Sequence, residues 1–433
     1  MKKNLLVLLS LILVFSAFLV GCNDSASKSE SSDDGKGTEL ELWTFNELHG
    51  KYFEYMADLW NKANPDEQIN LKASTYPYED AHNKLLVALQ SGKGAPDIAD
   101  IEVGKFANYL KGEPQLVELN DIVDPEREFI VPSRLDIYSK DGKNYGLPFH
   151  VGASVIYYNK EIMDKAGVNP DDIKTWDDYK AAGKVVLEKT GIPMTTLDVQ
   201  DPWSFWQQVA QLEGKDDLLT EDKKVNLTDA KVVKVLEYQQ ELIKEKIAIP
   251  APGNEHHAEE YYGFMNEGGA ASVWMPMWYM GRFVDYMPDL KGKIVIKPMP
   301  AWEEGTPRSA GMGGTGTVVT NQSKSPDLAK KFIAFAKLSK EGNIQIWKQL
   351  GFDPPRTDVW DAPELKESNK FTEYFGDNIF DTLVEVKDEI EGVNIGEKTP
   401  EVMDAIKTTI LFQSLVDMKD PKKALKEAED QIK

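Results

Sequence analysis

Apolar residues recur with two alternating periods along the chain from residue 38, and the alternation predicts strands and helices in turn. Apolar and polar residues alternate one by one over 40–45, which predicts a strand. Apolar side chains then recur at helical spacing over 49–64, until Pro65. The same order continues with a strand at 68–73, a helix at 78–91, a strand at 96–101 and a helix at 103–110. Such strand–helix–strand units predict an α/β lobe with a parallel sheet.

A second series of elements begins after residue 150. Its first strand is expected at 154–158, and a helix over 176–189 is expected to begin after the capping residue Thr175 and to end before Gly191. We expect a strand at 192–197, a helix at 229–246, strands at 270–274, 293–296 and 315–320, a helix at 326–338 capped by Ser325, and several amphipathic helices over 364–433. The chain has no internal repeat, so the pattern predicts an α/β fold with two lobes.

The N-terminus has the pattern of a lipoprotein signal peptide. Two lysines precede an almost purely apolar run over 5–20, and Gly21 comes directly before Cys22, the only cysteine of the chain. This order predicts a secretory signal peptide over 1–21 rather than a membrane span. Leu-Val-Gly-Cys also resembles the lipobox of bacterial lipoproteins, in which the cysteine sulfur carries a diacylglycerol. Residues 22–37 are rich in serine and charge, so we expect a lipidated Cys22 followed by a flexible tether.

Length and charge reduce the number of functions that the protein can have. Cleavage after Gly21 leaves 433 − 21 = 412 residues, which suits two lobes. The chain carries 50 basic and 72 acidic residues, and the signal peptide removes two lysines, so the mature net charge is 48 − 72 = −24. Because nucleic acids bind to a basic face, they are excluded as partners. With Cys22 in the anchor, neither a disulfide nor a metal–thiolate site can form.

Motifs for catalysis are absent, and two partial matches are weak. The sequence has no His-Glu-x-x-His, Gly-x-Ser-x-Gly or Walker motif, and no carboxylate pair stands out as a glycosidase dyad. Residues 311–316 match Gly-x-Gly-x-x-Gly but precede a strand, so we expect a flexible strand entry near a ligand or another lobe, and no cofactor. Residues 254–260 place His256 and His257 among acidic residues, which either a metal site or a solvated helix start explains.

Several segments, taken in order, resemble one family. They are the lipobox, the strand 40–45, Tyr52-Phe53 to Leu59-Trp60-Asn61, Gly94-Ala95-Pro96-Asp97-Ile98, Gly146-Leu147-Pro148, Tyr157-Tyr158-Asn159-Lys160, Trp176-Asp177-Asp178-Tyr179, Gly268-Gly269-Ala270-Ala271 leading to Trp274 and Trp278, Gly314-Thr315-Gly316, and Ser325-Pro326. Together they resemble the extracellular solute-binding proteins of carbohydrate ABC importers, over nearly the whole mature chain. Within that family the chain is most similar to lipoproteins that bind arabinan-derived oligosaccharides.

The resemblance implies a periplasmic-binding-protein-like type II fold. Two α/β lobes joined by a hinge bind sugar in the cleft between them and close around it. The resemblance implies an N-lobe at 38–149 plus 305–350 and a C-lobe at 150–304 plus 351–433. It implies crossovers of the hinge near 148–152, 298–304 and 351–357.

Sugar recognition needs aromatic rings against the apolar C–H faces and polar side chains around the hydroxyl rim. Two aromatic clusters, 203–206 and 274–279, offer such rings, although core packing is the competing explanation for each tryptophan. We predict the following ligand-binding residues: Asn46, Glu47, Asp100, Glu102, His150, Asp201, Trp203, Trp206, Trp274, Trp278 and Arg356. For three of these residues the ligand contact is implied by the resemblance. Trp278 matches the family's cleft tryptophan, and Asn46 and Glu47 match a position where this family often bonds sugar, although a helix cap is the competing explanation for them. Trp60, Trp176 and Trp347 lie in helix patterns and are expected in the core.

The leading hypothesis is a receptor with no catalytic activity, no cofactor and no bound metal, lipid-anchored on the extracellular face of the cell membrane. As a monomer it would bind an oligosaccharide, foremost an arabino-oligosaccharide, and deliver it to the membrane permease of an ABC importer with a cytoplasmic ATPase. The alternatives are a receptor for another oligosaccharide, a peptide or another solute, and a secreted lipoprotein glycosidase.

Overall fold

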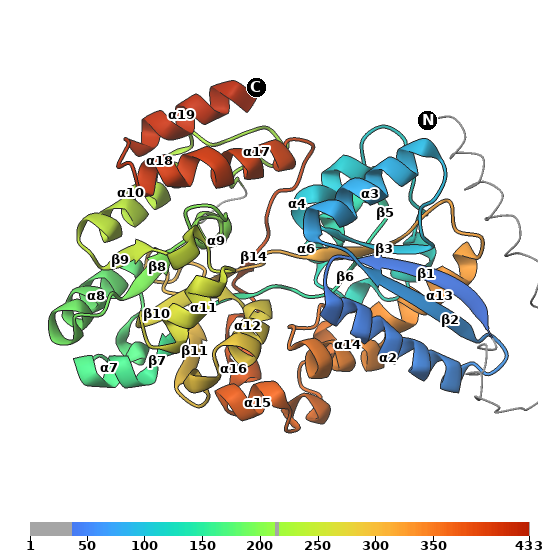
Figure 1. The fold of residues 1–433 in the computed structure, drawn as a ribbon, viewed down its shortest axis with the longest axis horizontal. Helices are drawn as coiled ribbons and strands as arrows, with labels where there is room; N and C mark the ends of the chain where they lie inside the picture. The colour runs from blue at the N-terminus through green and yellow to red at the C-terminus, as the bar shows by residue number, and fades with distance from the viewer. Residues whose placement is uncertain (1–36, 213–215, 433) are drawn as a thin grey trace, which may run out of the picture. The chain divides into compact units, whose positions relative to one another are not determined.

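The computed structural model describes residues 37–212 and 216–432, so the predicted signal peptide, Cys22 and nearly all of the tether lie outside the described residues. Thr38–Lys433 forms one compact unit. Within this unit the helices and strands gather around two larger sheets, which define an N-lobe and a C-lobe (Figure 1).

The N-lobe contains a five-stranded sheet in the order β2-β1-β3-β13-β6. Its strands are β1 (Thr38–Thr44), β2 (Ile69–Thr75), β3 (Ile98–Glu102), β6 (Leu147–Pro148) and β13 (Thr315–Val319). β1 is parallel to β2 and β3, whereas β13 runs antiparallel to β3 and β6. Its helices are α2 (Glu47–Ala63), α3 (Tyr78–Ser91), α4 (Val103–Phe106), α5 (Asn120–Val123), α6 (Pro132–Asp136), α13 (Pro326–Lys337) and α14 (Lys340–Gln345). The buried faces of α2 and α13 pack together with β1 in one apolar core.

The C-lobe contains a three-stranded antiparallel sheet in the order β10-β7-β11, and a separate parallel pair, β8 and β9. The strands are β7 (Ser154–Asn159), β8 (Thr195–Leu197), β9 (Ala248–Pro250), β10 (Ser272–Pro276) and β11 (Ile294–Pro298). The helices are α7 (Lys160–Ala166), α8 (Trp176–Thr190), α9 (Trp203–Ala210), α10 (Ala230–Lys244), α11 (Glu259–Asn266), α12 (Met280–Tyr286), α15 (Lys370–Phe375), α16 (Ile379–Val386), α17 (Thr399–Ala405), α18 (Leu411–Leu415) and α19 (Pro421–Ile432).

The chain crosses between the lobes three times, and the crossing segments hydrogen-bond to one another. The first crossing, 149–153, lies between β6 and β7. The second lies at 311–314, and the Met312 N–H donates to the carbonyl of Gly152 at 2.8 Å. A third segment joins them, because the Asp353 carboxylate accepts the N–H groups of Gly152 and Ala153 at 3.1 and 2.7 Å.

The prediction for the second crossing, at 298–304, was wrong. After β11 the chain makes a hairpin on the C-lobe, in which the Met299 N–H donates to the Arg308 carbonyl at 3.1 Å. Arg308 forms ion pairs with Glu385 and Glu389 of the α16 region, which hold this hairpin in place. The short strand β12 (Ser309–Ala310) then pairs with β14 (Ile390–Glu391). Residues 305–310 therefore pack with the C-lobe and not with the predicted N-lobe.

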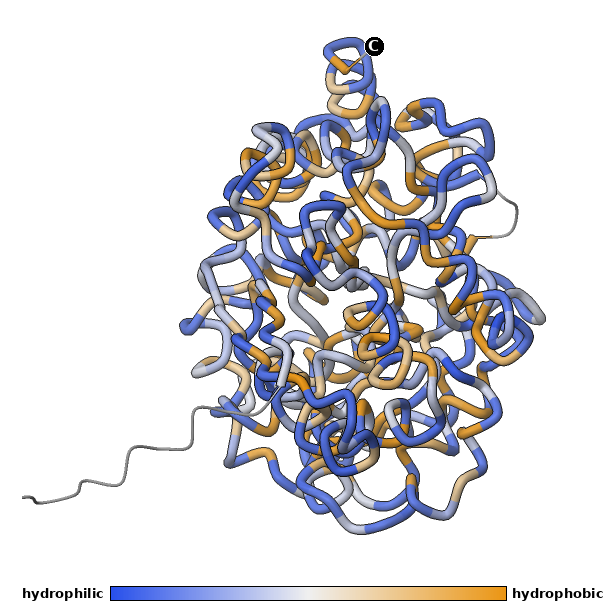
Figure 2. Tube along the Cα trace, turned by 90° about the vertical axis from the view of Figure 1, so that its right-hand side faces the viewer, coloured by the Kyte–Doolittle hydropathy of each residue, from blue (hydrophilic) through white to orange (hydrophobic). Residues whose placement is uncertain are grey.

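Apolar and polar stretches alternate along the whole described unit (Figure 2). The remaining short strands are β4 (Ser139–Lys140) and β5 (Lys143–Asn144).

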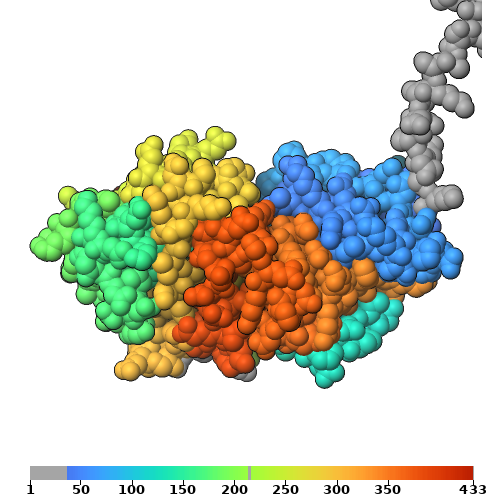
Figure 3. Space-filling model, turned by 90° about the horizontal axis from the view of Figure 1, so that it is seen from below, coloured from blue at the N-terminus to red at the C-terminus, as the bar shows by residue number. Residues whose placement is uncertain are grey.

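On the face seen in Figure 3, the orange-to-red part of the chain lies between the green and yellow segments of the C-lobe and the blue segments of the N-lobe. In this part Trp347 packs in the C-lobe core, while Leu350 packs in the N-lobe core. The lobes are therefore joined by packing as well as by the crossings.

Candidate functional site

The burial of the ten tryptophans separates core residues from candidates for ligand contact. Seven are buried, at 6% exposure or less: Trp43, Trp60, Trp176, Trp206, Trp274, Trp347 and Trp360. Trp206 and Trp274 were predicted to bind ligand, but each is 1% exposed in the C-lobe core, where no ring face is open to a sugar. Trp203, Trp278 and Trp302 are partly exposed.

Trp203, His257 and Trp278 form a group that we call the interlobe aromatic cluster. Trp203 begins α9, and its ring centroid lies 5.5 Å from that of Trp278, with the planes at 75°. His257 stacks on Trp278, with centroids 5.7 Å apart and planes at 19°. Trp278 packs against the cores of both lobes, and its Nε1 donates to the carbonyl of Met312 at 3.1 Å. The cluster therefore lies where the two lobes meet.

The glycine-rich segment 311–316 allows this close approach. Gly313 has a φ of +67°, and a Cβ there would lie 2.9 Å from Nε1 of Trp278. At Gly314, a Cβ would lie 2.5 Å from the guanidinium of Arg134. Side chains are excluded from both positions by backbone conformation and by lack of space. The segment brings the backbone of one lobe close to a ring of the other, which agrees with the expected strand entry near another lobe.

Charged side chains flank the aromatic cluster on the C-lobe. Asp201 is 7% exposed, and its carboxylate lies 3.1 Å from Nδ1 of His257 and 3.7 Å from Nζ of Lys407. β8 and β9 are parallel neighbours, so the loops that follow them lie at the same edge. The loop after β8 carries Asp201, and the loop after β9 carries His257, which explains why two residues distant in the sequence meet here.

The N-lobe contributes Glu102 and Tyr78 opposite this edge. Oε2 of Glu102 accepts the Tyr78 hydroxyl at 2.9 Å and the Gly104 N–H at 2.7 Å. Burial raises the pKa of Glu102, although the Tyr78 hydrogen bond and the positive charge of Lys407 oppose this. Burial first, and then nearby carboxylates that include Asp201 of the C-lobe, raise the pKa of Tyr78. α17 also packs against α4, so groups of both lobes face each other across a short distance.

Asp100 was predicted to bind ligand but is engaged inside the N-lobe. It is 3% exposed, and its two oxygens accept the hydroxyls of Thr44 and Thr317, both at 2.8 Å. One of these oxygens also lies 3.2 Å from Nδ1 of His49. In this arrangement both oxygens already have protein partners, and the ligand contact remains an untested prediction.

Four further predicted residues have structural partners or little access. Arg356 is 5% exposed and pairs with Glu126 and Asp358. Oδ1 of Asn46 caps α2 by accepting the Leu48 N–H at 2.9 Å, which is the competing explanation, and exposed Glu47 pairs with Lys51. His150 is 5% exposed at the first crossing, with its Nδ1 unpartnered, and burial lowers its pKa well below the ordinary value.

Sequence reasoning did not identify Tyr78, His257 and Lys407 as members of this site. His257 was considered only as a metal ligand or a solvated charge, and the position of its loop after a strand was the signal available. Lys407 lies in η10 (Ile406–Ile410), directly after α17, in a stretch with no distinguishing pattern. Its role depends on tertiary packing of the C-terminal helices.

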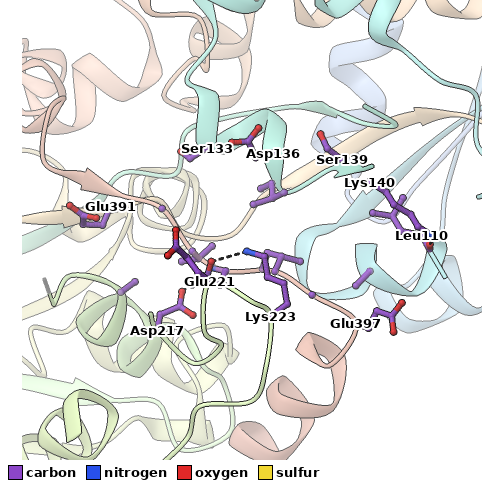
Figure 4. Close-up of a pocket in the computed structure, with 18 residues that line it drawn as sticks. Leu110, Ser133, Asp136, Ser139, Lys140, Asp217, Glu221, Lys223, Glu391 and Glu397 are labelled. Carbon is purple, nitrogen blue, oxygen red and sulfur yellow. Dashed lines mark hydrogen bonds between the residues drawn. The ribbon is translucent and has the colours of Figure 1, made fainter. Parts of the chain in front are cut away.

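A cavity elsewhere between the lobes has different chemistry from the interlobe aromatic cluster. It is a cavity of about 570 Å³, lined by Ala107, Leu110, Ser133, Asp136, Ile137, Ser139 and Lys140 of the N-lobe and by Ala210, Asp217, Glu221, Lys223 and residues 391–397 (Figure 4). None of these lining residues carries an aromatic ring. The cavity therefore lacks the ring faces that sugar recognition uses, whereas the interlobe aromatic cluster supplies them.

Thr196, His256 and Asp198 are spaced like a hydrolase triad. His256 Nδ1 lies 3.0 Å from the Asp198 carboxylate, and its Nε2 lies 2.9 Å from the Thr196 hydroxyl. All three are buried, so no substrate reaches the hydroxyl. The solvated explanation for this histidine was therefore wrong. Within 37–212 and 216–432, no group of three or more His, Cys, Asp or Glu side chains is arranged to hold a metal ion.

Comparison with known proteins links this geometry to one family. Residues 46–342 match the model of the bacterial extracellular solute-binding protein family. The arabinooligosaccharide-binding protein of Bacillus subtilis (strain 168) is 48% identical over 437 residues, which cover 100% of both chains. That of Halalkalibacterium halodurans is 51% identical, over 92% of this chain and 90% of the relative.

Solved structures agree on the fold. The ABC transporter associated binding protein from B. animalis subsp. lactis Bl-04, solved in complex with β-1,6-galactobiose, has a TM-score of 0.75 at 24% identity, over 92% of this chain and 97% of that one. The sugar-binding protein MalE of Xanthomonas citri has a TM-score of 0.74 at 18% identity, over 91% and 96% of the two chains. At these identities the likeness concerns the two-lobed fold alone.

Proposed function

Because the chain belongs to the bacterial extracellular solute-binding protein family, we propose that it binds an oligosaccharide at the interlobe aromatic cluster and delivers it to an ABC importer. The observation that carries this proposal is the pair Trp203 and Trp278, which keep partly exposed rings while seven other tryptophans are buried. Two rings at 75° offer faces in two directions, which suits the C–H faces of more than one sugar unit.

Polar groups around the rings suit the hydroxyl rim. Asp201 and Glu102 carry acceptor oxygens, and Lys407, His257 and Tyr78 carry donors. Because Glu102 and Tyr78 come from the N-lobe and the others from the C-lobe, a ligand between them contacts both lobes. Such contacts favour a closed state over an open one.

We propose an arabino-oligosaccharide as the ligand. Support comes from the two relatives at 48% and 51% identity, which are arabinooligosaccharide-binding proteins and match the chain over 90% or more of their length. The alternative is another oligosaccharide, because the proposed contacts recognise rings and hydroxyls without specifying the linkage. The family and these relatives consist of binding proteins, and the protein is not an enzyme.

The place of action that we propose is supported by the family and by the N-terminal sequence. The family is extracellular, and no helix among the described residues is long and apolar enough to cross a membrane. We propose that a diacylglycerol on Cys22 holds the monomeric protein at the outer face of the membrane, close to the permease, after removal of residues 1–21. A Cys22→Ala variant should remain uncleaved or be shed; processing and detergent partitioning like those of the wild type would contradict the anchor.

Calorimetric titration tests the ligand. The mature chain should be titrated with defined arabino-oligosaccharides, with hexose oligosaccharides of equal length as controls. We expect saturable binding of arabino-oligosaccharides, with at least about tenfold weaker binding of the hexose series, a difference of about 1.4 kcal/mol. Tighter binding of a hexose oligosaccharide would mean that the ligand is not an arabino-oligosaccharide, while the protein would still be an oligosaccharide-binding protein. Binding of peptides alone, or slow hydrolysis of the sugar, would overturn the proposal.

A further inference from the structure

Two fully buried side chains, Asp198 and His256, form a pair that lies next to the interlobe aromatic cluster without belonging to it. Both side chains are completely inaccessible. Burial raises the pKa of Asp198, but the interactions with His256 lower this pKa by more than burial raises it. The net pKa is therefore below the ordinary value, and the carboxylate is ionised at neutral pH. A buried pair costs desolvation free energy and is weak evidence for a stabilising role. Its partners therefore point to another role.

Asp198 holds the start of α9. Its carboxylate accepts the Ser204 N–H at 3.2 Å, and the Ser204 hydroxyl in turn accepts the Asp198 N–H at 3.2 Å. Ser204 directly follows Trp203, so this reciprocal pair fixes the backbone that carries the Trp203 ring. Ser204 is completely buried, whereas Trp203 is partly exposed.

His256 holds the other two members of the cluster. Its backbone N–H donates to Asp198 at 2.8 Å, and the next residue is His257. Its carbonyl accepts the hydroxyl of Tyr279, which directly follows Trp278. Tyr279 is also fully buried. Each ring of the cluster is thus adjacent in sequence to a buried residue that is bonded to, or belongs to, the Asp198–His256 pair.

We propose that the Asp198–His256 pair is a positioning device, which fixes Trp203, His257 and Trp278 relative to one another before ligand binds. This inference rests on the proposed function. The three rings come from the segments that follow β8, β9 and β10, and the pair connects all three. Fixed rings spare the ligand the free-energy cost of ordering them, which is the general advantage of a preorganised site.

The mildest test removes one oxygen atom. Tyr279→Phe deletes the hydroxyl that reaches the His256 carbonyl and leaves every ring in place. Tyr179→Phe is the matched control: Tyr179 is fully buried in the same lobe, and its hydroxyl lies 2.7 Å from the Ser272 hydroxyl, away from the cluster. With arabinotriose as the probe, we expect Tyr279→Phe to weaken binding about threefold or more, because one buried hydrogen bond is lost. Tyr179→Phe should lower the melting temperature and leave the affinity within about twofold of the wild type, because its hydrogen bond lies away from the site.

A double variant separates positioning from general stability. Asp198→Asn should weaken arabinotriose binding by at least about tenfold, because the amide has one acceptor oxygen where the carboxylate has two for the N–H groups of Ser204 and His256. Adding Tyr279→Phe to it should cost less than the product of the two single losses, because both act through the same element. The inference would be overturned if the double variant lost affinity by the full product of the two single losses, or if the Tyr279→Phe protein bound as the wild type does. If Asp198→Asn does not fold, Tyr279→Phe alone decides. A wild type that binds no sugar would instead overturn the proposed function.

Discussion

Two of the places where the lobes meet differ in kind: the interlobe aromatic cluster and the cavity along residues 391–397. The cavity offers about 570 Å³ of space but no aromatic ring. The cluster offers two partly exposed tryptophans, a stacked imidazole and charged groups from both lobes. For a sugar, ring faces and hydroxyl partners decide recognition, and empty volume alone supplies neither. The comparison therefore favours the cluster over the cavity as the proposed sugar site, because of the chemistry of its residues and not because of volume.

The largest loss of affinity is expected from removing a ring of the cluster. Trp278→Ala should weaken oligosaccharide binding at least about tenfold, a cost on the order of 1–3 kcal/mol for the lost burial of one large side chain. Calorimetry measures the affinity, and far-UV circular dichroism should show a folded protein. Ligand should also shift the tryptophan fluorescence of the wild type, because the sugar excludes water from a ring.

Trp347→Ala is the control for this variant. Trp347 is fully buried, and its Nε1 donates to the Leu365 carbonyl at 3.1 Å. We expect a loss of stability of about 3–5 kcal/mol from the cavity created, with affinity unchanged under conditions where the protein is folded. Unchanged binding by Trp278→Ala, together with lost binding by a folded Trp347→Ala, would show that the cluster is not the site.

Acid should lower the free energy of unfolding through His82, which contacts Tyr78 and Glu102 of the N-lobe. His82 is buried, its Nδ1 lies 2.7 Å from the Tyr78 carbonyl, and its Nε2 accepts the N–H of Glu102 at 3.0 Å. Burial lowers its pKa to about 4. The unfolded chain binds this proton near pH 6.5, so the free energy of unfolding falls as the pH drops from 6.5 toward 4, by about 2 kcal/mol at pH 5.

The variant His82→Gln isolates this contribution. Its amide can donate to the Tyr78 carbonyl and accept from Glu102, but it does not titrate. Urea unfolding at pH 7 and pH 5 should show a smaller loss of stability for His82→Gln than for the wild type. Equal losses in the two proteins would mean that His82 does not carry this acid sensitivity.

A smaller effect is expected from the N-lobe carboxylate itself. Glu102→Gln retains an oxygen for the Tyr78 hydroxyl but removes the charge facing Lys407. We expect about threefold weaker sugar binding, because a neutral acceptor forms weaker hydrogen bonds than an ionised one. An affinity equal to that of the wild type would place the ligand entirely on the C-lobe rings.

A substitution in the cavity should have almost no effect on oligosaccharide affinity. Glu397 lines it and is exposed. Glu397→Ala should leave oligosaccharide affinity within about twofold of the wild type, since a surface change away from the site costs less than about 0.5 kcal/mol. A loss as large as that of Trp278→Ala would reverse the comparison and make the cavity the binding site.

Local sequence signals predicted most elements of the fold. The helix predicted at 78–91 is α3 (Tyr78–Ser91), and Thr175 caps α8 in a capping box with Asp178, as those residue types favour. Ser325 precedes α13 as predicted, but its side chain forms no cap hydrogen bond. The hairpin after β11 was missed because it depends on distant ion pairs of Arg308.

The site was harder to predict, because neighbouring residues of the same type have opposite environments. Trp203 and Trp206 lie three residues apart on α9, yet the first is partly exposed and the second is 1% exposed. His256 is completely buried beside Asp198, whereas His257 stacks on Trp278. Which member faces the other lobe depends on how the lobes pack, and composition and spacing contain no information about that packing.

A crystal structure of the mature protein with a bound arabino-oligosaccharide tests the central claim most directly. The account predicts sugar rings in stacking contact with Trp203 and Trp278, with hydroxyls bonded to Asp201 of the C-lobe and to Glu102 or Tyr78 of the N-lobe. Electron density for the sugar in the cavity along residues 391–397, with both tryptophan rings uncovered, would contradict it.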